Sequence, residues 1–220
     1  MRFRATILTL LLVLAHLYSQ NNKYSTFYYQ RASLFEALPI DTTDIVFLGN
    51  SITNGAEWHE LFNNPNIKNR GISGDVCEGV FDRLDAITNG MPSKIFLMIG
   101  INDVARGTTL DSISSGIEKI VDKIQKDSPI TKIYVQSVLP LNDETGMFGG
   151  HTKRYLEIPC LNSKLEKLSI EKDVTYIDLF SYLTIPNTSK IDLKYSNDGL
   201  HLLGAGYLKW VDVLRPYIEE

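Results

Sequence analysis

The chain has 220 residues and a small acidic excess, with 26 aspartates and glutamates against 22 lysines and arginines. That length fits one domain with a substantial core, and the acidic excess gives no electrostatic reason to bind nucleic acid or an anionic membrane. Only two cysteines are present, which excludes a disulfide framework and a cysteine-rich metal site.

The first residues have the pattern of an export signal. Arg2 and Arg4 precede an apolar run over 5–15, and Ser19 is a small residue where a signal peptidase would cut. The run is short for a transmembrane span, which needs about 20 residues. We expect a signal peptide over 1–20 and a single domain over 21–220, exported to the periplasm or secreted and without stable membrane insertion after cleavage. An uncleaved membrane anchor is the alternative.

The two cysteines leave a choice open. After export, Cys77 and Cys160 could form one disulfide. Two free buried thiols are the slightly favoured interpretation.

Apolar runs of strand length alternate with amphipathic helical patterns along the chain. This alternation predicts a three-layer α/β/α sandwich with about five mostly parallel strands. The second strand is the least hydrophobic and is therefore expected at the sheet edge. Strands are expected over 45–48, 66–71, 94–99, 133–138 and 174–179, and helices over 25–39, 57–62, 76–87, 110–126, 159–171 and 202–218.

A candidate nucleophile follows the first strand. The apolar residues Ile45–Leu48 end at Gly49, and the polar turn after it would carry the Ser51 hydroxyl to the carboxyl edge of the sheet. Open α/β folds bind their ligands at this edge. Taken alone, a serine after a strand is more often a helix N-cap or a turn residue.

Asp198 and His201 supply the groups that a serine nucleophile needs. A histidine takes the hydroxyl proton at neutral pH, and a carboxylate orients the imidazole through its other nitrogen. The two residues lie three positions apart in a turn before the last helix. Without Ser51, an ordinary turn aspartate and a histidine near a helix start would be the better interpretation.

Acyl transfer also needs hydrogen-bond donors for the oxyanion. The backbone N–H groups of Ser51 and Gly74 and the side-chain amide of Asn102 follow the ends of neighbouring strands, so they could meet at one edge of the sheet. The alternatives are a turn glycine at position 74 and a helix cap at position 102.

These residues lie in four ordered blocks that resemble the SGNH hydrolases, also called GDSL lipases and esterases. The blocks are Gly49–Thr53, Asn69–Asp75, Gly100–Asp103 and Asp198–His201. The resemblance implies a flavodoxin-like sheet, Ser51 as nucleophile, Asp198 and His201 completing the triad, and an oxyanion hole of Ser51, Gly74 and Asn102. It also implies that no metal or organic cofactor takes part. One departure is Asn50, where the family usually has aspartate; we expect it to keep the turn through the same local hydrogen bonds.

The sequence thus predicts an exported serine esterase that acts on a small-molecule or glycan ester through a covalent acyl-enzyme. The 69–75 block looks most like the carbohydrate and sialate O-acetylesterase branch, so a carbohydrate O-acetyl ester is the preferred substrate. A lysophospholipase or thioesterase of the same family is one alternative, and a non-catalytic glycan-binding protein on a hydrolase fold is another. The oligomeric state is not indicated.

Asp75, Asp103, Arg106 and His151 could line the pocket without acting as catalysts. Asp75 and Asp103 have the positions of helix-start residues, and Arg106 follows them along the chain. His59 and His151 are expected to be solvated. The polar stretch 142–150 is the best candidate for a variable loop over the site.

Overall fold

The computed structural model describes residues 23–220. The predicted signal over 1–20 lies outside the described residues and stays a prediction. Within residues 23–220, no helix is long and apolar enough to cross a membrane.

Five parallel strands form one sheet in the order β2-β1-β3-β4-β5. This is the flavodoxin-like order, so the predicted fold class is confirmed. The less hydrophobic second strand is at the sheet edge, as expected. The strands are β1 (Ile45–Gly49), β2 (Ile67–Gly71), β3 (Lys94–Met98), β4 (Lys132–Gln136) and β5 (Thr175–Ile177).

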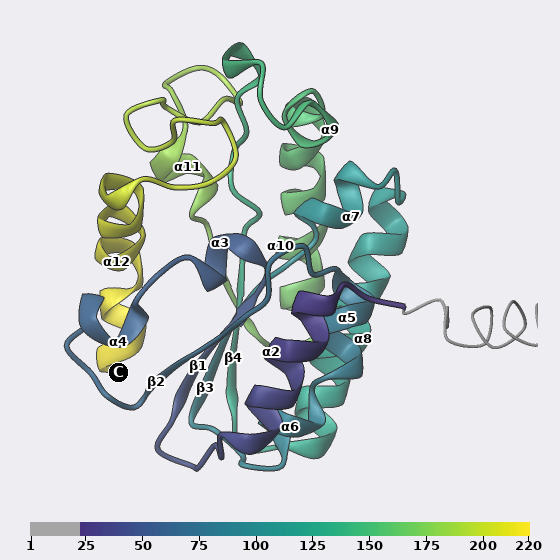
Figure 1. The fold of residues 1–220 in the computed structure, drawn as a ribbon, viewed down its shortest axis with the longest axis vertical. Coiled ribbons are helices and arrows are strands. Elements are labelled where there is room, and N and C mark those ends of the chain that lie inside the picture. Colours follow the sequence, from purple (N-terminus) through teal and green to yellow (C-terminus); the bar gives the residue numbers. More distant parts are fainter. Residues whose placement is uncertain (1–22) are drawn as a thin grey trace, which may run out of the picture.

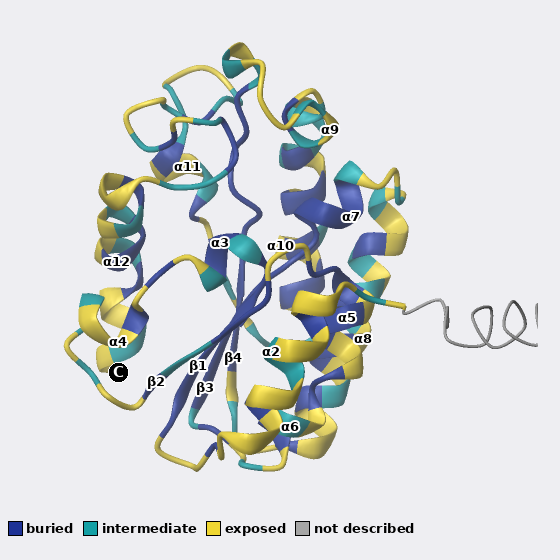
Figure 2. Ribbon diagram, viewed as in Figure 1, coloured by how far each residue is buried: buried dark blue, intermediate teal, exposed yellow. Residues whose placement is uncertain are grey.

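Helices cover both faces of the sheet. Helices α4 and α12 lie on one side, and α2, α5 and α8 lie on the other, as Figure 1 shows. In Figure 2 strands β1 and β3 are buried along their whole length, whereas the outer faces of the helices are exposed. The helices are α2 (Thr26–Ala37), α3 (Ser51–Asn54), α4 (Trp58–Leu61), α5 (Cys77–Asp82), α6 (Asp85–Thr88), α7 (Ile101–Ala105), α8 (Leu110–Asp127), α9 (Gly149–Thr152), α10 (Ile158–Glu171), α11 (Phe180–Leu183) and α12 (Gly204–Glu219), with 3-10 turns at Asp143–Thr145 and Tyr155–Glu157.

An aromatic row crosses the centre of the sheet. Phe47, Phe96 and Tyr134 are register partners on β1, β3 and β4, and their ring centroids are 5.1 and 4.5 Å apart. These distances match the spacing of neighbouring strands, so the stack follows from the register. Trp58 of α4 stacks on Phe47 at 4.2 Å, and Trp210 of α12 meets Trp58 edge-on at 4.8 Å. The row fixes these strands and helices against one another beneath the carboxyl edge of the sheet.

Two predictions need correction. The helix expected over 76–87 is two short helices, because α5 ends at Asp82 and α6 begins at Asp85. Arg83 stands at the break, and its side chain turns inward to the loops above the sheet. Both cysteines are free, but only Cys77 is buried; Cys160 is exposed.

Candidate active site

Ser51 is the first residue of α3, directly beyond the carboxyl end of β1 (Figure 1). The side-chain oxygen of Asn50 accepts a hydrogen bond from the Ile52 backbone N–H at 3.0 Å. The asparagine therefore keeps the turn, as expected. A side chain at Gly49 would collide with the backbone of β3, so only glycine fits where the strand enters this turn. As the first helical residue, Ser51 has a backbone N–H with no acceptor within its own helix.

His201 lies between Ser51 and Asp198. Its Nε2 is 3.1 Å from the Ser51 Oγ, and its Nδ1 is 2.8 Å from the Asp198 Oδ2. An ionised carboxylate can only accept, so Nδ1 carries the hydrogen and the lone pair of Nε2 faces the hydroxyl. The structure thus brings the three predicted triad residues into one hydrogen-bonded chain.

The Asp198 carboxylate is held by its own turn. Its Oδ1 accepts backbone N–H groups from Leu200 at 2.8 Å and from His201 at 2.7 Å. Burial alone would raise the pKa of Asp198, but the hydrogen bonds from the His201 ring and from these two backbone groups outweigh it, and the pKa lies below its ordinary value. The carboxylate is therefore ionised at neutral pH. The His201 side chain is 34% exposed, so a substrate can reach it.

Gly74 and Asn102 are the other two predicted oxyanion donors. Gly74 has φ +79°, and nothing lies within 4 Å of the position where a Cβ would stand. Its left-handed backbone is one that glycine adopts without strain. Asn102, in α7 beyond the end of β3, donates from Nδ2 to the carbonyl of Asp75 at 2.8 Å. That bond ties Asn102 to the residue next to Gly74, and the second amide hydrogen has no partner among residues 23–220.

A buried ion pair supports the Gly74 loop. The Asp75 Oδ2 is 2.9 Å from both Nε and Nη2 of Arg83, and the two side chains are 0% and 4% exposed. Arg83 also donates to the backbone carbonyls of Arg70 at 2.9 Å and Gly49 at 3.1 Å. The guanidinium therefore links the loop to the carboxyl ends of β1 and β2. Arg83 was not identified from the sequence. A signal was present, because Arg83 is three positions after Val80 and would therefore put a charge on the apolar face of the helix predicted over 76–87.

The other polar residues have supporting contacts. Asp103 lies in the first turn of α7, as expected, and its carboxylate accepts the backbone N–H of Cys77 at the start of α5 at 3.2 Å. Arg106 is exposed and donates to the carbonyl of Gly74 at 3.0 Å. His59 is exposed, as expected.

The expectation that His151 is solvated is wrong. Its ring is half-buried, and its Nε2 lies 2.9 Å from the Oδ1 of Asn102. The neighbouring Phe148 packs edge-on against the His201 ring, with centroids 5.1 Å apart. Phe148 lies in the 142–150 stretch that was predicted to form a loop over the site, and His151 follows that stretch directly, so the polar loop does contact the site. The sequence around Phe148 and His151 is rich in glycine and has no hydrophobic periodicity, so no sequence pattern predicted that these two side chains contact the site.

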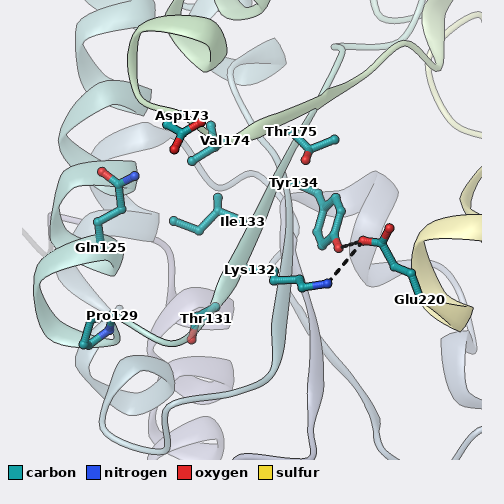
Figure 3. A pocket seen from close by; sticks show the side chains of 10 residues that line it. All are labelled: Gln125, Pro129, Thr131, Lys132, Ile133, Tyr134, Asp173, Val174, Thr175 and Glu220. Carbon is teal, nitrogen blue, oxygen red and sulfur yellow. Dashed lines mark hydrogen bonds and ion pairs between the residues drawn. The ribbon is translucent and has the colours of Figure 1, made fainter.

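Two cavities differ in their relation to these residues. One of about 510 Å³ lies at the amino-terminal ends of β4 and β5, where Lys132 is 3.8 Å from Glu220. Figure 3 shows its lining residues, and none of the predicted site residues is among them. The other, about 230 Å³, is lined by Gly74, Arg106 and the rings of Tyr24 and Tyr28. The second cavity therefore adjoins Gly74, one of the three predicted oxyanion donors. Within residues 23–220, no group of three or more histidine, cysteine or acidic side chains is arranged to hold a metal ion.

A family model for the GDSL-like lipase/acylhydrolase family matches residues 47–209, which contain the four blocks and the whole hydrogen-bonded chain. The chain belongs to this family. It is therefore an ester hydrolase, as the sequence predicted.

Similar proteins match most of the chain. The human platelet-activating factor acetylhydrolase IB subunit alpha2 is 28% identical over 183 residues, 80% of this chain and 76% of that protein. A GDSL-like lipase structure from Bacteroides thetaiotaomicron has 24% identity and a TM-score of 0.75, covering 87% of this chain and 97% of its own. An acetylxylan esterase structure from Geobacillus stearothermophilus has 16% identity and a TM-score of 0.65, covering 82% and 96%. The last two show that the fold is shared.

Proposed function

We propose that the protein is a serine esterase that removes acetyl groups from carbohydrate esters. The observation that carries the proposal is the hydrogen-bonded chain from the Ser51 hydroxyl through His201 to Asp198. This is the arrangement of a nucleophile, a general base and its orienting carboxylate.

The chemistry proceeds in two balanced steps. The Ser51 Oγ attacks the acyl carbon while its proton passes to His201 Nε2, and the oxyanion accepts hydrogen bonds from the N–H groups of Ser51 and Gly74 and from the free amide hydrogen of Asn102. The C–O bond to the alcohol then breaks, and His201 gives that alcohol the proton. In the second step His201 takes a proton from water, and the water oxygen attacks the acyl carbon; the bond between that carbon and the Ser51 Oγ then breaks, His201 returns the proton to Oγ, and the acid leaves.

Two features favour an acetylated sugar. The cavity beside Gly74 is lined by the tyrosines at positions 24 and 28 and by Ser73 and Arg106, and aromatic rings with polar neighbours suit a sugar ring better than an alkyl chain. The names of two similar proteins, the acetylxylan esterase and the platelet-activating factor acetylhydrolase, both specify an acetyl group. The second name also makes an acetylated lipid the competing substrate. A lysophospholipase or thioesterase with a longer acyl group is the remaining alternative within the family.

Hydrolysis of aryl esters from acetate to octanoate tests the acyl preference. We expect turnover to be greatest with acetate and to be lost in the Ser51→Ala variant, while Ser33→Ala, which changes an exposed serine of α2, should behave like the parent. Activity that rises with chain length would favour the lipase or thioesterase. Retained activity in Ser51→Ala would overturn the nucleophile assignment.

A second comparison separates the alcohols. Acetylated xylo-oligosaccharides and platelet-activating factor are offered at equal concentration, and released acetate is measured. We expect faster release from the sugar; faster release from the lipid would reverse the substrate assignment.

Export remains part of the proposal, because a basic start and an apolar run are typical of a signal peptide. Determining the N-terminal residue of the protein recovered from the producing cells tests whether the signal is cleaved.

A further inference from the structure

Asn102 is held by two partners from different parts of the chain. Its Nδ2 donates to the backbone carbonyl of Asp75 at 2.8 Å, and its Oδ1 lies 2.9 Å from Nε2 of His151 in α9. The Asn102 side chain is nearly buried, and the residue is 9% exposed. Both polar ends of the amide therefore have a fixed partner.

The chemistry of these partners fixes which way the amide points. A backbone carbonyl can only accept, so it must face the NH2 end of Asn102. The amide oxygen can only accept as well, so His151 must carry its hydrogen on Nε2. Rotation of the amide by 180° would place two oxygens together and two N–H donors together. In the observed orientation the second hydrogen of Nδ2 is left free.

His151 is the opposite tautomer of His201. The Asp198 carboxylate keeps the hydrogen of His201 on Nδ1, whereas the Asn102 oxygen keeps that of His151 on Nε2. Burial lowers the pKa of His151, and the nearby His201 and Arg106 lower it further. A neutral His151 donates to Asn102 without placing a second positive charge beside the ring that must accept the serine proton.

We propose that His151 is a positioning residue that holds the side-chain amide of Asn102 in its oxyanion-donating orientation. The inference rests on the proposed function, because it assigns Asn102 to the oxyanion hole. The hydrogen bond to Oδ1 also polarises the amide and strengthens the donor at its other end. His151 itself does not touch the reacting atoms.

A double-mutant cycle on an aryl acetate tests this role. Asn102→Ala should lower kcat by about 10²–10³-fold, the usual loss for one oxyanion donor. His151→Leu removes one hydrogen bond behind that donor and should lower kcat by roughly 10-fold, with KM little changed. In the Asn102→Ala background, His151→Leu should have almost no further effect, since it acts through the missing amide. An equal loss in both backgrounds, or a change confined to KM, would overturn the proposal.

Two variants control for structural damage. His151→Gln keeps an N–H donor and should restore most of the activity lost in His151→Leu. Lys153→Leu introduces the same side chain at an exposed neighbour and should leave kcat unchanged. If His151→Gln were as slow as His151→Leu although both variants unfolded at the parent temperature, the donor role would be wrong.

A spectroscopic measurement tests the contact without turnover. Two-bond ¹H–¹⁵N correlation spectra report which ring nitrogen of a histidine carries the hydrogen, and His151→Gln assigns the His151 signals. We expect the Nε2–H tautomer, together with a shift of the Asn102 side-chain signal in His151→Leu. An Nδ1–H tautomer would overturn the proposal. A protein that hydrolysed no ester but gave the expected tautomer would refute the proposed function and leave the contact standing.

Discussion

The two sides of the candidate site are built in different ways. On the base side, the Asp198 carboxylate receives its hydrogen bonds from Ser196, Leu200 and His201, all within three positions of it. On the oxyanion side, Asn102 depends on Asp75, which is 27 positions away, and on His151, which is 49 positions away. The bonds to the carboxylate are local, although the backbone of its turn also accepts hydrogen bonds from Asn142 and Thr145, whereas the bonds of the Asn102 amide are all tertiary contacts. Changes far from the reacting atoms should therefore damage the oxyanion side more than the base side.

The largest expected effect is on the local side. Asp198→Asn should lower kcat by about 10⁴-fold, as the equivalent change does in the serine-protease triad, because an amide favours the wrong histidine tautomer. The asparagine oxygen can still accept the two backbone N–H groups of the turn, so folding at neutral pH should be little affected. Steady-state kinetics and thermal unfolding measure the two effects. A loss below 10-fold would show that the base side does not depend on this carboxylate.

The same variant should change the response of stability to acid. The folded-state pKa of Asp198 is lowered, so its contribution to stability is present above the unfolded pKa and is lost as the pH falls through the folded value. The parent should therefore lose stability below a pH of about 4, where unperturbed aspartates titrate. Asp198→Asn lacks this group and should lose less over that range. Denaturation midpoints at stepped pH values measure the difference, and parallel curves would contradict it.

The next largest effect tests the tertiary support. Arg83→Met leaves the Asp75 carboxylate buried without its partner, and such a loss typically costs about 3–5 kcal/mol of unfolding free energy. The double variant Asp75→Asn/Arg83→Met removes the unpaired charge and should recover part of that loss. Urea denaturation measures both. If the single variant were as stable as the parent, the ion pair would not support the Gly74 loop.

The smallest expected effect concerns the turn before the nucleophile. Asn50→Ala removes the acceptor that caps α3 and should cost about 1 kcal/mol, whereas Asn50→Asp keeps an acceptor oxygen and should cost less. Urea denaturation of the three proteins checks this order. Equal losses in both variants would indicate that burial of the side chain, rather than its hydrogen bond, matters here.

The sequence predicted the sheet well because buried parallel strands leave unbroken apolar runs. The run at Ile95–Ile99 gave β3 to within one residue of its end, and the polar character of the second strand gave its place at the edge. The pattern over 76–87 predicted one helix and missed the break at Arg83. Periodicity records which positions are apolar, but it does not say that a guanidinium between them is needed by a loop above the sheet.

The candidate site also has one part that the sequence predicted and one part that it did not. The blocks around Ser51, Asp198 and His201 could be found from the sequence because turn chemistry and short spacings are local properties of the chain. The contact of His151 with Asn102 could not be found, since it depends on how a loop between β4 and α10 closes over the end of β3. The sequence by itself determined the order of strands and helices, the turn that presents Ser51, and the Asp198–His201 pair. The tertiary structure alone decided which buried and half-buried side chains support the oxyanion donors, because those contacts join residues whose separation along the chain carries no periodic signal.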